Sequence, residues 1–285
     1  MTNLTPSPLP LWKHRPRRKR APPLLFGTRG PGSLYRRLKS LGLLATRDRA
    51  AALAFLFADY PDPFPLAERI ELIARFVAAT NAIRCYHTQA ELFVVADALL
   101  RMGRRPGLTV VEAGVAKAAS SAKLSLVVSR LGGTLHLFDS FRGIPHNGEK
   151  LTRLDGSPVE FFKGAFTGRV PTVTQNLQRF GCPRCCVLHK GLFEETLPAF
   201  EPGAGRFIDL ALLDVDLLSS TRTCLTHLFP KLRLGGAIFT QDGHIREVVE
   251  LLGSARFWID EVGVVSPPRI EGLGKRKLLK IVRES

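Results

Sequence analysis

From residue 109 onward, short apolar runs alternate with amphipathic segments. The runs predict strands near residues 109–115, 134–139, 187–190, 210–215 and 237–240, because each is brief and nearly continuous in hydrophobic residues. Apolar residues at helical spacing predict helices near residues 119–131, 170–180, 219–228 and 245–252. Such an alternation predicts a mostly parallel sheet that is covered by helices on both faces.

The two ends of this region follow other patterns. Residues 34–102 have helical periodicity and predict an N-terminal helical extension, which could form a lid or a surface for a homo-oligomer. After the last helix, strands are expected at residues 257–262 and 277–282, with a linker between them that is long enough for an antiparallel hairpin. The sequence pattern therefore predicts seven strands, of which the last two form a terminal hairpin.

The first two strands each end in a carboxylate. Glu112 closes the first and Asp139, 27 residues later, closes the second, which is the spacing of a nucleoside-binding βαβ unit. The loop after Glu112 runs from Gly114 to Ser120 and does not contain Gly-x-Gly-x-x-Gly, so close approach of a pyrophosphate is disfavoured. A phosphate-free, cationic nucleoside such as S-adenosylmethionine fits this pattern. The alternative is a pair of core strands that merely end in acids.

The same order of elements defines the fold class. Five parallel strands followed by an antiparallel hairpin are an α/β architecture, the Rossmann-like fold of class I methyltransferases, whereas nicotinamide-binding domains usually end in a parallel strand. We expect three regions: a basic disordered arm at residues 1–32, the helical extension at residues 33–104, and an S-adenosylmethionine-binding methyltransferase domain at residues 105–285.

Positive charge is concentrated in the tails. The formal net charge is +16, to which residues 1–50 contribute +11 and residues 269–285 contribute +4. The arm around residues 13–20 could contact nucleic acid or an anionic membrane surface, which makes a nucleic-acid methyltransferase the main rival hypothesis. Against it, the nearly neutral middle of the chain lacks an aromatic and basic pattern for stacking bases.

Composition also indicates the compartment. No apolar run reaches the ~18–20 residues of a membrane span, and no secretory signal pattern is evident at the N-terminus. Five cysteines do not form a secretory disulfide framework, although Cys182, Cys185 and Cys186 include one half of a zinc-like spacing. We therefore expect a cytoplasmic protein.

Polar residues also end the fourth and fifth strands. Asp214 closes the fourth, and Gln241, Asp242 and His244 follow the fifth. Because the carboxyl ends of parallel strands meet at one edge of the sheet, we expect these side chains to converge beside the nucleoside pocket. Oxygen ligands from two strand ends suit Mg²⁺.

Four ordered motifs resemble the macrocin O-methyltransferase (TylF/MycF-like) family. They are Glu112-Ala113-Gly114, the stretch from Phe138 to Pro145, the stretch from Lys190 to Pro198, and Asp214-Val215-Asp216-Leu217 with Ser220-Thr221. The similarity covers roughly residues 85–285. It implies methyl transfer from S-adenosylmethionine to a hydroxyl, in the named members on a sugar of a glycosylated natural product, with Mg²⁺ assisting. The acceptor would be a sugar or a related small metabolite.

The resemblance also implies roles for single residues. The methionine end of S-adenosylmethionine would lie against Glu112, Gly114 and Ser120, and the ribose against Asp139 and Ser140. The adenine would face the turn that contains Leu192 and Phe193. Asp214 would serve the metal and act as the base, and Asp242 would be a second metal ligand, with Gln241 beside it.

Three departures from the family pattern bear on these roles. Ala118 and Ala119 stand where the family often has glycines. Gln241 replaces an acid, so magnesium should bind more weakly, or His244 should compensate and favour softer metals. The chain also has no clear counterpart of the family's substrate-loop histidine, for which His146 is the candidate. These departures leave open a third hypothesis, a binding or scaffold protein whose catalysis has decayed. For Asp216 the open alternative is a structural acid that caps the following helix.

Overall fold

The computed structural model describes residues 9–10, 46–203 and 207–284. Most of the expected basic arm at residues 1–32, and the start of the helical extension up to residue 45, lie outside the described residues. The nucleic-acid hypothesis, which rests on that arm, is therefore untested by the fold.

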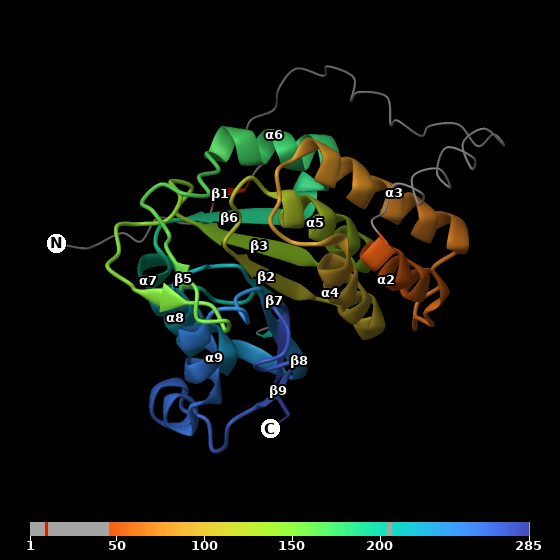
Figure 1. Ribbon diagram of the computed structural model, residues 1–285. Coiled ribbons are helices and arrows are strands. Elements are labelled where there is room, and N and C mark those ends of the chain that lie inside the picture. Colours follow the sequence, from red (N-terminus) through yellow and green to blue (C-terminus); the bar gives the residue numbers. More distant parts are fainter. Residues whose placement is uncertain (1–8, 11–45, 204–206, 285) are drawn as a thin grey trace.

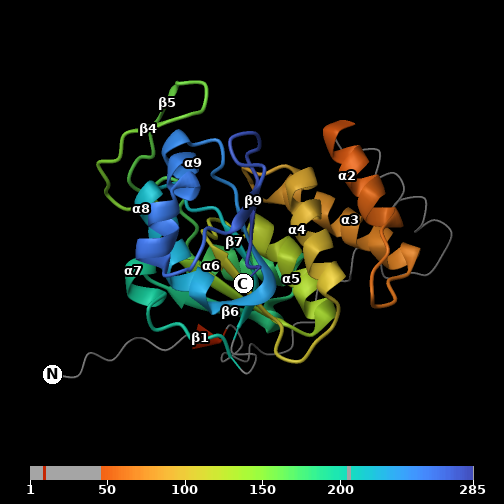
Figure 2. The same cartoon turned by 90° about the horizontal axis from the view of Figure 1, so that it is seen from below.

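The central sheet has the strand order β1-β6-β3-β2-β7-β8-β10-β9 (Figures 1 and 2). Strands β6, β3, β2, β7 and β8 are parallel to one another, and β10 pairs antiparallel with both β8 and β9. The predicted Rossmann-like class I methyltransferase fold with a terminal hairpin is thus confirmed. At the opposite edge, the two-residue strand β1 pairs antiparallel with β6. The bounds are β1 Leu9–Pro10, β2 Thr109–Ala113, β3 Thr134–Asp139, β6 Cys186–Lys190, β7 Ile208–Leu213, β8 Leu232–Thr240, β9 Arg269–Glu271 and β10 Leu279–Val282.

Helices cover both faces of this sheet (Figure 1). One apolar core lies between the sheet and α2–α6, and a second lies between the other face and α8 and α9. Every residue of β2 and of β7 is buried, because both of their faces are covered. The helices are α2 Thr46–Phe57, α3 Leu66–Ala82, α4 Gln89–Met102, α5 Ala119–Leu131, α6 Val170–Phe180, α7 Phe193–Thr196, α8 Leu218–Leu228 and α9 Arg246–Gly253.

The helical extension is part of the first of these layers. Helices α3 and α4 pack against α5, and α2 packs against α4. Helix α4 begins with a capping box, in which Thr88 Oγ1 accepts from the Glu91 N–H and Glu91 Oε2 accepts from the Thr88 N–H. The cap at Thr88 marks the end of the segment that connects α3 to α4, and this segment lies at the carboxyl edge of the sheet.

The prediction of a strand at residues 257–262 was wrong. Phe257–Val262 forms a π-helical segment, and the first hairpin strand is β9, within the stretch that was expected to be the linker. Phe257, Trp258 and Val262 are buried while Ile259 is exposed, so the apolar positions follow a helical turn and do not alternate. Trp258 Nε1 donates to the Leu252 carbonyl oxygen at 2.8 Å, which holds the segment against the end of α9.

The insert between β3 and α6 contains a small hairpin that rests on α8 and α9. Its strands are β4 Leu151–Thr152 and β5 Pro158–Val159. Thr152 donates through N–H and Oγ1 to Glu247, at 2.9 and 2.7 Å. Glu149 accepts from the N–H groups of Leu218 and Ser219 at 2.7 and 3.0 Å, so a carboxylate 69 residues away caps α8. The N-cap residue of α8 itself, Leu217, makes no side-chain hydrogen bond.

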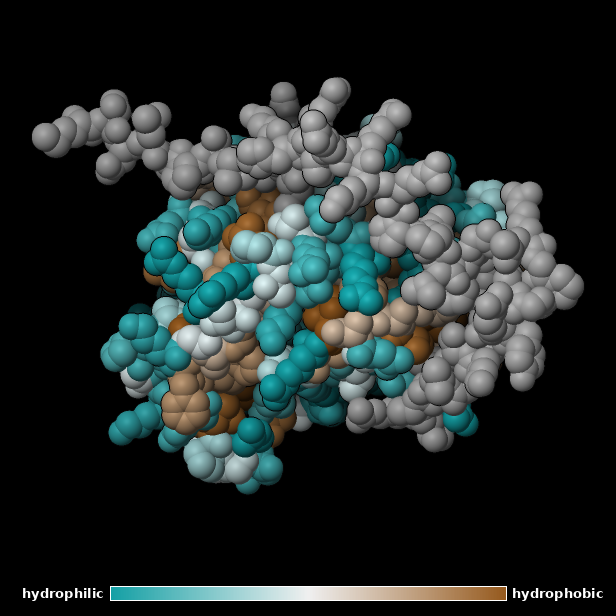
Figure 3. Space-filling view, turned by 90° about the horizontal axis from the view of Figure 1, so that it is seen from above, coloured by the Kyte–Doolittle hydropathy of each residue, from teal (hydrophilic) through white to brown (hydrophobic). Residues whose placement is uncertain are grey.

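Among the described residues, no helix is long and apolar enough to cross a membrane. Seen from above, hydrophilic side chains surround smaller hydrophobic areas on the part of the face that is drawn in colour (Figure 3). Helix α6 illustrates the pattern, since only Val173 and Leu177 of its residues are buried.

Candidate active site

The carboxyl ends of β2, β3 and β7 open into a cavity. Gly114, Asp139 and Asp214 line it from the strand ends, and Phe193 lines it from the start of α7. Residues 84–87, between α3 and α4, complete its wall and are called the roof segment below. The cavity therefore lies where this fold class binds its nucleoside ligand.

The loop after β2 is shaped by close packing. Gly114 has φ +86°, and a Cβ at this position would lie 1.9 Å from the Asp214 carbonyl oxygen, so only glycine fits. Ala116 and Ala118 also have positive φ, at 44° and 65°. The N–H groups of Val115 and Ala116 both donate to Asp139 Oδ2, at 2.8 and 3.0 Å. These donors are occupied, which agrees with the prediction that the loop does not cradle a pyrophosphate.

Glu112 lies fully buried at the base of this loop. Ser120 Oγ, in the first turn of α5, donates to Glu112 Oε1, while Oε2 has no hydrogen-bond partner among the described residues. Burial raises the pKa of Glu112 to about 7, and the hydrogen bond from Ser120 opposes this rise. A cation placed beside Oε2 would satisfy that oxygen and favour the ionised carboxylate.

Asp139 and Ser140 both line the cavity, as expected for ribose-binding residues. Asp139 also has a structural role, because Oδ1 accepts from the Phe141 N–H at 2.6 Å in addition to the two bonds at Oδ2. Burial raises its pKa, and these backbone donors counteract the effect. Oδ1 retains a lone pair that can accept from a hydroxyl.

The two residues expected to contact the adenine, Leu192 and Phe193, differ in their position relative to the cavity. Phe193 lines the cavity. Leu192 precedes it as the N-cap of α7 and is 39% exposed, and it is not part of the cavity wall. A direct adenine contact of Leu192 stays a prediction.

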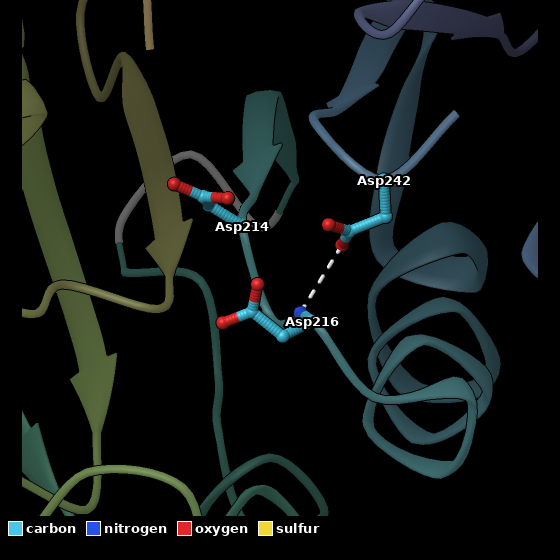
Figure 4. A group of neighbouring side chains, drawn as sticks. All are labelled: Asp214, Asp216 and Asp242. Atoms are coloured by element: carbon cyan, nitrogen blue, oxygen red, sulfur yellow. Dashed lines mark hydrogen bonds between the residues drawn. The ribbon is translucent and has the colours of Figure 1, made fainter. Parts of the chain in front are cut away.

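Three aspartates meet beside the cavity (Figure 4). Ligand oxygens of Asp214, Asp216 and Asp242 all lie within 4.8 Å of one another. Asp242 Oδ2 accepts from the N–H groups of Val215 and Asp216, each at 3.3 Å, and Oδ1 is buried without a partner among the described residues. None of the three carboxylates forms an ion pair in the described part of the chain. The cluster therefore brings three carboxyl groups together without a paired cation among the described residues.

Burial and mutual repulsion raise the pKa values of the carboxyl groups in this cluster. Burial raises the pKa of Asp242 to about 7, and the charge of Asp214 adds to the rise. Burial raises the pKa of Asp214 to about 6, while the Lys277 ammonium opposes this effect. The pKa of Asp216 is raised by burial and then by Asp242 and Asp214. A bound cation would favour the ionised form of all three carboxyl groups.

The sequence interpretation missed Asp216 as a member of this cluster. The available signal was the Asp-x-Asp spacing after a strand, which places two carboxylates at one sheet edge. Asp216 has φ +64° in the turn, and α8 is capped by Glu149, so the helix-capping alternative is wrong. Gln241 is 1% exposed, and neither amide atom has a hydrogen-bond partner among the described residues. Its role as a metal ligand stays a prediction.

The two candidate histidines from the sequence, His146 and His244, differ in burial and in their distance along the chain from the aspartate cluster. His146 is exposed in the insert and does not line the cavity. His244 follows Asp242, and its Nδ1 is buried without a partner among the described residues. Burial lowers the pKa of His244, so the ring is neutral at pH 7.

A family profile and several solved methyltransferase structures are similar to this chain. The family profile described as macrocin O-methyltransferase (TylF) matches residues 105–256. The solved structure of the O-methyltransferase NovP aligns with a TM-score of 0.55 and 17% identity, over 89% of this chain and 99% of its own. CalS11, a calicheamicin methyltransferase, aligns with a TM-score of 0.53 and 17% identity, over 90% and 95%.

A third structure, the S-adenosylhomocysteine-bound methyltransferase PaMTH1 of Podospora anserina, aligns with a TM-score of 0.50 and 12% identity, over 84% of this chain and 96% of its own. At these identities the structural likeness shows the fold alone. No curated protein sequence matches significantly. The family profile, however, spans more than half of the 285 residues. The chain therefore belongs to the macrocin O-methyltransferase family and is an S-adenosylmethionine-dependent O-methyltransferase.

Proposed function

We propose that this protein transfers the methyl group of S-adenosylmethionine to a hydroxyl of a sugar or a related small metabolite, with the assistance of a divalent cation. One observation carries the proposal: Asp214 belongs both to the wall of the nucleoside cavity and to the cluster of three aspartates. A methyl donor in the cavity and an acceptor hydroxyl at the cluster would therefore be neighbours.

Residues in and directly behind the cavity wall fit the methyl donor. Glu112 is not part of the wall itself but is hydrogen-bonded to Ser120, which is. The unpaired Oε2 of the buried Glu112 suits the cationic methionine end, and Ser120 holds the other carboxylate oxygen in place. Asp139 and Ser140 offer oxygens to the ribose diol, Gly114 permits close approach, and Phe193 offers a ring to the adenine. These proposed roles are the ones that the family resemblance implies.

The aspartate cluster fits a divalent cation. Its donors are carboxylate oxygens, which Mg²⁺ prefers, and the buried Oδ1 of Asp242 lacks any other partner among the described residues. We propose Asp214, Asp216 and Asp242 as the holders of this cation, with Gln241 as a further candidate. When bound, the cation would lower the pKa of an acceptor hydroxyl.

The protein's own side chains would align the reactants and remove the proton. The methyl donor is already activated by its sulfonium charge, so the enzyme must align two reactants and remove one proton. Asp214 can accept that proton, because it belongs both to the cavity wall and to the cluster of three aspartates. Its raised pKa, about 6, makes it a stronger base than an exposed aspartate while leaving it largely ionised at pH 7. The roof segment forms one wall of the cavity beside these groups.

The cellular compartment is also part of the proposal. All five cysteines are free thiols. This usage favours a reducing cytoplasm, where small glycosylated metabolites and S-adenosylmethionine are both available.

The proposal is tested by measuring S-adenosylhomocysteine formation with a panel of sugar-bearing hydroxyl acceptors, in the presence of Mg²⁺ or of EDTA. We expect EDTA to suppress turnover, and Asp214→Asn and Asp242→Asn to lower kcat by about 10²-fold or more, as loss of a general base or a metal ligand does. Asp155→Asn, at an exposed acid of the insert, is the matched control. Turnover that withstands EDTA and both substitutions would remove the mechanism.

A further inference from the structure

Lys123 is a charged side chain that the fold buries completely, with 0% exposure. It lies on α5, three residues after Ser120 and hence on the same face of the helix. Its only hydrogen-bond partner within the described residues is the His87 ring, at 3.2 Å between Nζ and Nε2. Removing an ammonium from water without a paired anion is costly, so such a charge is expected to serve a ligand.

The groups that favour the charged form of Lys123 electrostatically, Cys85 and then Asp48, form no hydrogen bond or ion pair with it in the described part of the chain. Asp48 influences Lys123 electrostatically, but Asp48 Oδ1 accepts from the Ala90 N–H at 2.9 Å. No ion pair of Lys123 is found in the described part of the chain. Burial lowers the pKa of Lys123 to about 8, so the group is still mostly charged at pH 7.

The contact with Lys123 determines the tautomer of His87. An ammonium group has three donors and no acceptor, so His87 Nε2 must accept and the ring proton must sit on Nδ1. The ring does not take a second proton at neutral pH, because burial lowers its pKa well below the usual value, and Lys123 and Lys277 lower it further. The Nδ1–H group is thus a donor, and no residue in the described ranges accepts from it.

His87 also lies at the cavity. It is part of the roof segment that lines the cavity, together with Ser120 from α5. Lys277 steadies this segment by donating from Nζ to the Tyr86 carbonyl oxygen at 3.0 Å. The first turn of α5 adds positive potential on the same side. Glu112, in contrast, contributes negative charge from the strand end.

The methyl donor carries matching charges, since its amino-acid end has one ammonium and one carboxylate. We propose that His87, held and polarised by the buried Lys123, binds the carboxylate of the amino-acid end of S-adenosylmethionine, while Glu112 receives its ammonium. This inference rests on the proposed cofactor site and extends it by two residues. Lys123 is a positioning residue in this arrangement, because it acts through His87.

Calorimetry with a matched pair of ligands tests the inference. S-adenosylmethionine and decarboxylated S-adenosylmethionine differ only in the carboxylate. For Lys123→Met and for His87→Phe, we expect the Kd of S-adenosylmethionine to rise about 10-fold or more, the size of a charge-assisted hydrogen bond. The Kd of the decarboxylated ligand should change less than about twofold. Lys123→Met should fold, because methionine fills a similar volume without a buried charge.

Three outcomes would overturn the inference. An equal loss for both ligands would indicate general damage to the cavity, and an unchanged Kd for S-adenosylmethionine would show that the carboxylate binds elsewhere. In both cases the cofactor site itself stands, since the wild-type protein binds S-adenosylmethionine. A wild-type protein that binds neither ligand would instead overturn the proposed function together with this inference.

Discussion

Replacing Asp242 with asparagine should stabilise the metal-free protein at pH 8, although it changes a buried residue of the site. Asp242 is 1% exposed, and its ionised form lies beside two other carboxylates. The asparagine oxygen can still accept from the N–H groups of Val215 and Asp216, which now bond Asp242 Oδ2 at 3.3 Å. The substitution thus removes the charge and keeps the shape and the hydrogen bonds.

The magnitude follows from the pKa of Asp242, which burial and Asp214 raise from 3.8 to about 7. When the pKa of a carboxyl group is higher in the folded than in the unfolded protein, the free energy of unfolding is greatest below the unfolded-state pKa. It decreases as the pH rises from the unfolded-state pKa to the folded-state pKa, and it no longer changes with pH above the folded-state pKa. The loss amounts to at most about 4 kcal/mol at about 1.4 kcal/mol per pH unit. Part of it is shared with Asp214 and Asp216, which ionise in the same cluster.

Urea unfolding in EDTA at pH 5 and pH 8 measures this effect. The advantage of Asp242→Asn over the wild type should grow from about 1–2 kcal/mol at pH 5 to about 3–4 kcal/mol at pH 8. Mg²⁺ should stabilise the wild type at pH 8 and the variant much less. A variant that is less stable than the wild type at pH 8, or an advantage that does not depend on pH, would refute the reasoning.

Asp209→Asn is the matched control, because Asp209 is equally buried but compensated. Its Oδ1 pairs with Arg105 and Arg233 at 2.9 and 2.8 Å, and its Oδ2 accepts from the Thr109 N–H at 2.7 Å. The same chemical change should here destabilise the protein by about 3–5 kcal/mol, because it leaves two guanidinium groups without their anion.

Three further predictions concern the cavity and the core. Gly114→Ala should abolish S-adenosylmethionine binding in calorimetry and lower the Tm, because its Cβ would lie 1.9 Å from the Asp214 carbonyl oxygen at φ +86°. The affinity of the wild type for S-adenosylmethionine should fall as the pH drops from 8 to 6, because Glu112, with a pKa of about 7, becomes protonated and loses its charge. Glu112→Gln should bind about 10-fold more weakly and show little of this pH dependence. Trp258→Ala should lower the free energy of unfolding by about 3–5 kcal/mol in urea titration, since this fully buried ring packs on Phe229 and its indole N–H is hydrogen-bonded.

The sequence was sufficient for the sheet and for much of the cavity. Continuous apolar runs identify strands buried on both faces, and helices α5 and α6 begin and end at the residues that periodicity predicts. Because parallel strands place their carboxyl ends at one edge, the sequence could place Glu112, Asp139, Asp214 and Asp242 at the same edge of the sheet. The lack of a glycine-rich loop likewise indicated a ligand without phosphates.

Other features depend on contacts that are distant in sequence. The segment Phe257–Val262 has the composition of a strand, yet packing of Trp258 against Phe229 and the Leu252 carbonyl makes it helical. The cap of α8 comes from Glu149, 69 residues earlier. Asp216 joins the cluster because its turn adopts a left-handed conformation, which residue types alone do not specify.

The chain by itself thus determined the parallel strands, most of the helices that cover them and the sheet edge at which the acids gather, because hydrophobic periodicity and the order of elements can be read along the sequence. The tertiary structure decided how each side chain is partnered: Glu112 and Asp242 each retain an oxygen without a hydrogen bond, and Lys123 meets only His87, as far as the described residues show. Partnering depends on three-dimensional packing across segments far apart in the chain. Because burial makes an unpaired charge costly, those unmatched groups carry the functional information that the sequence alone did not reveal.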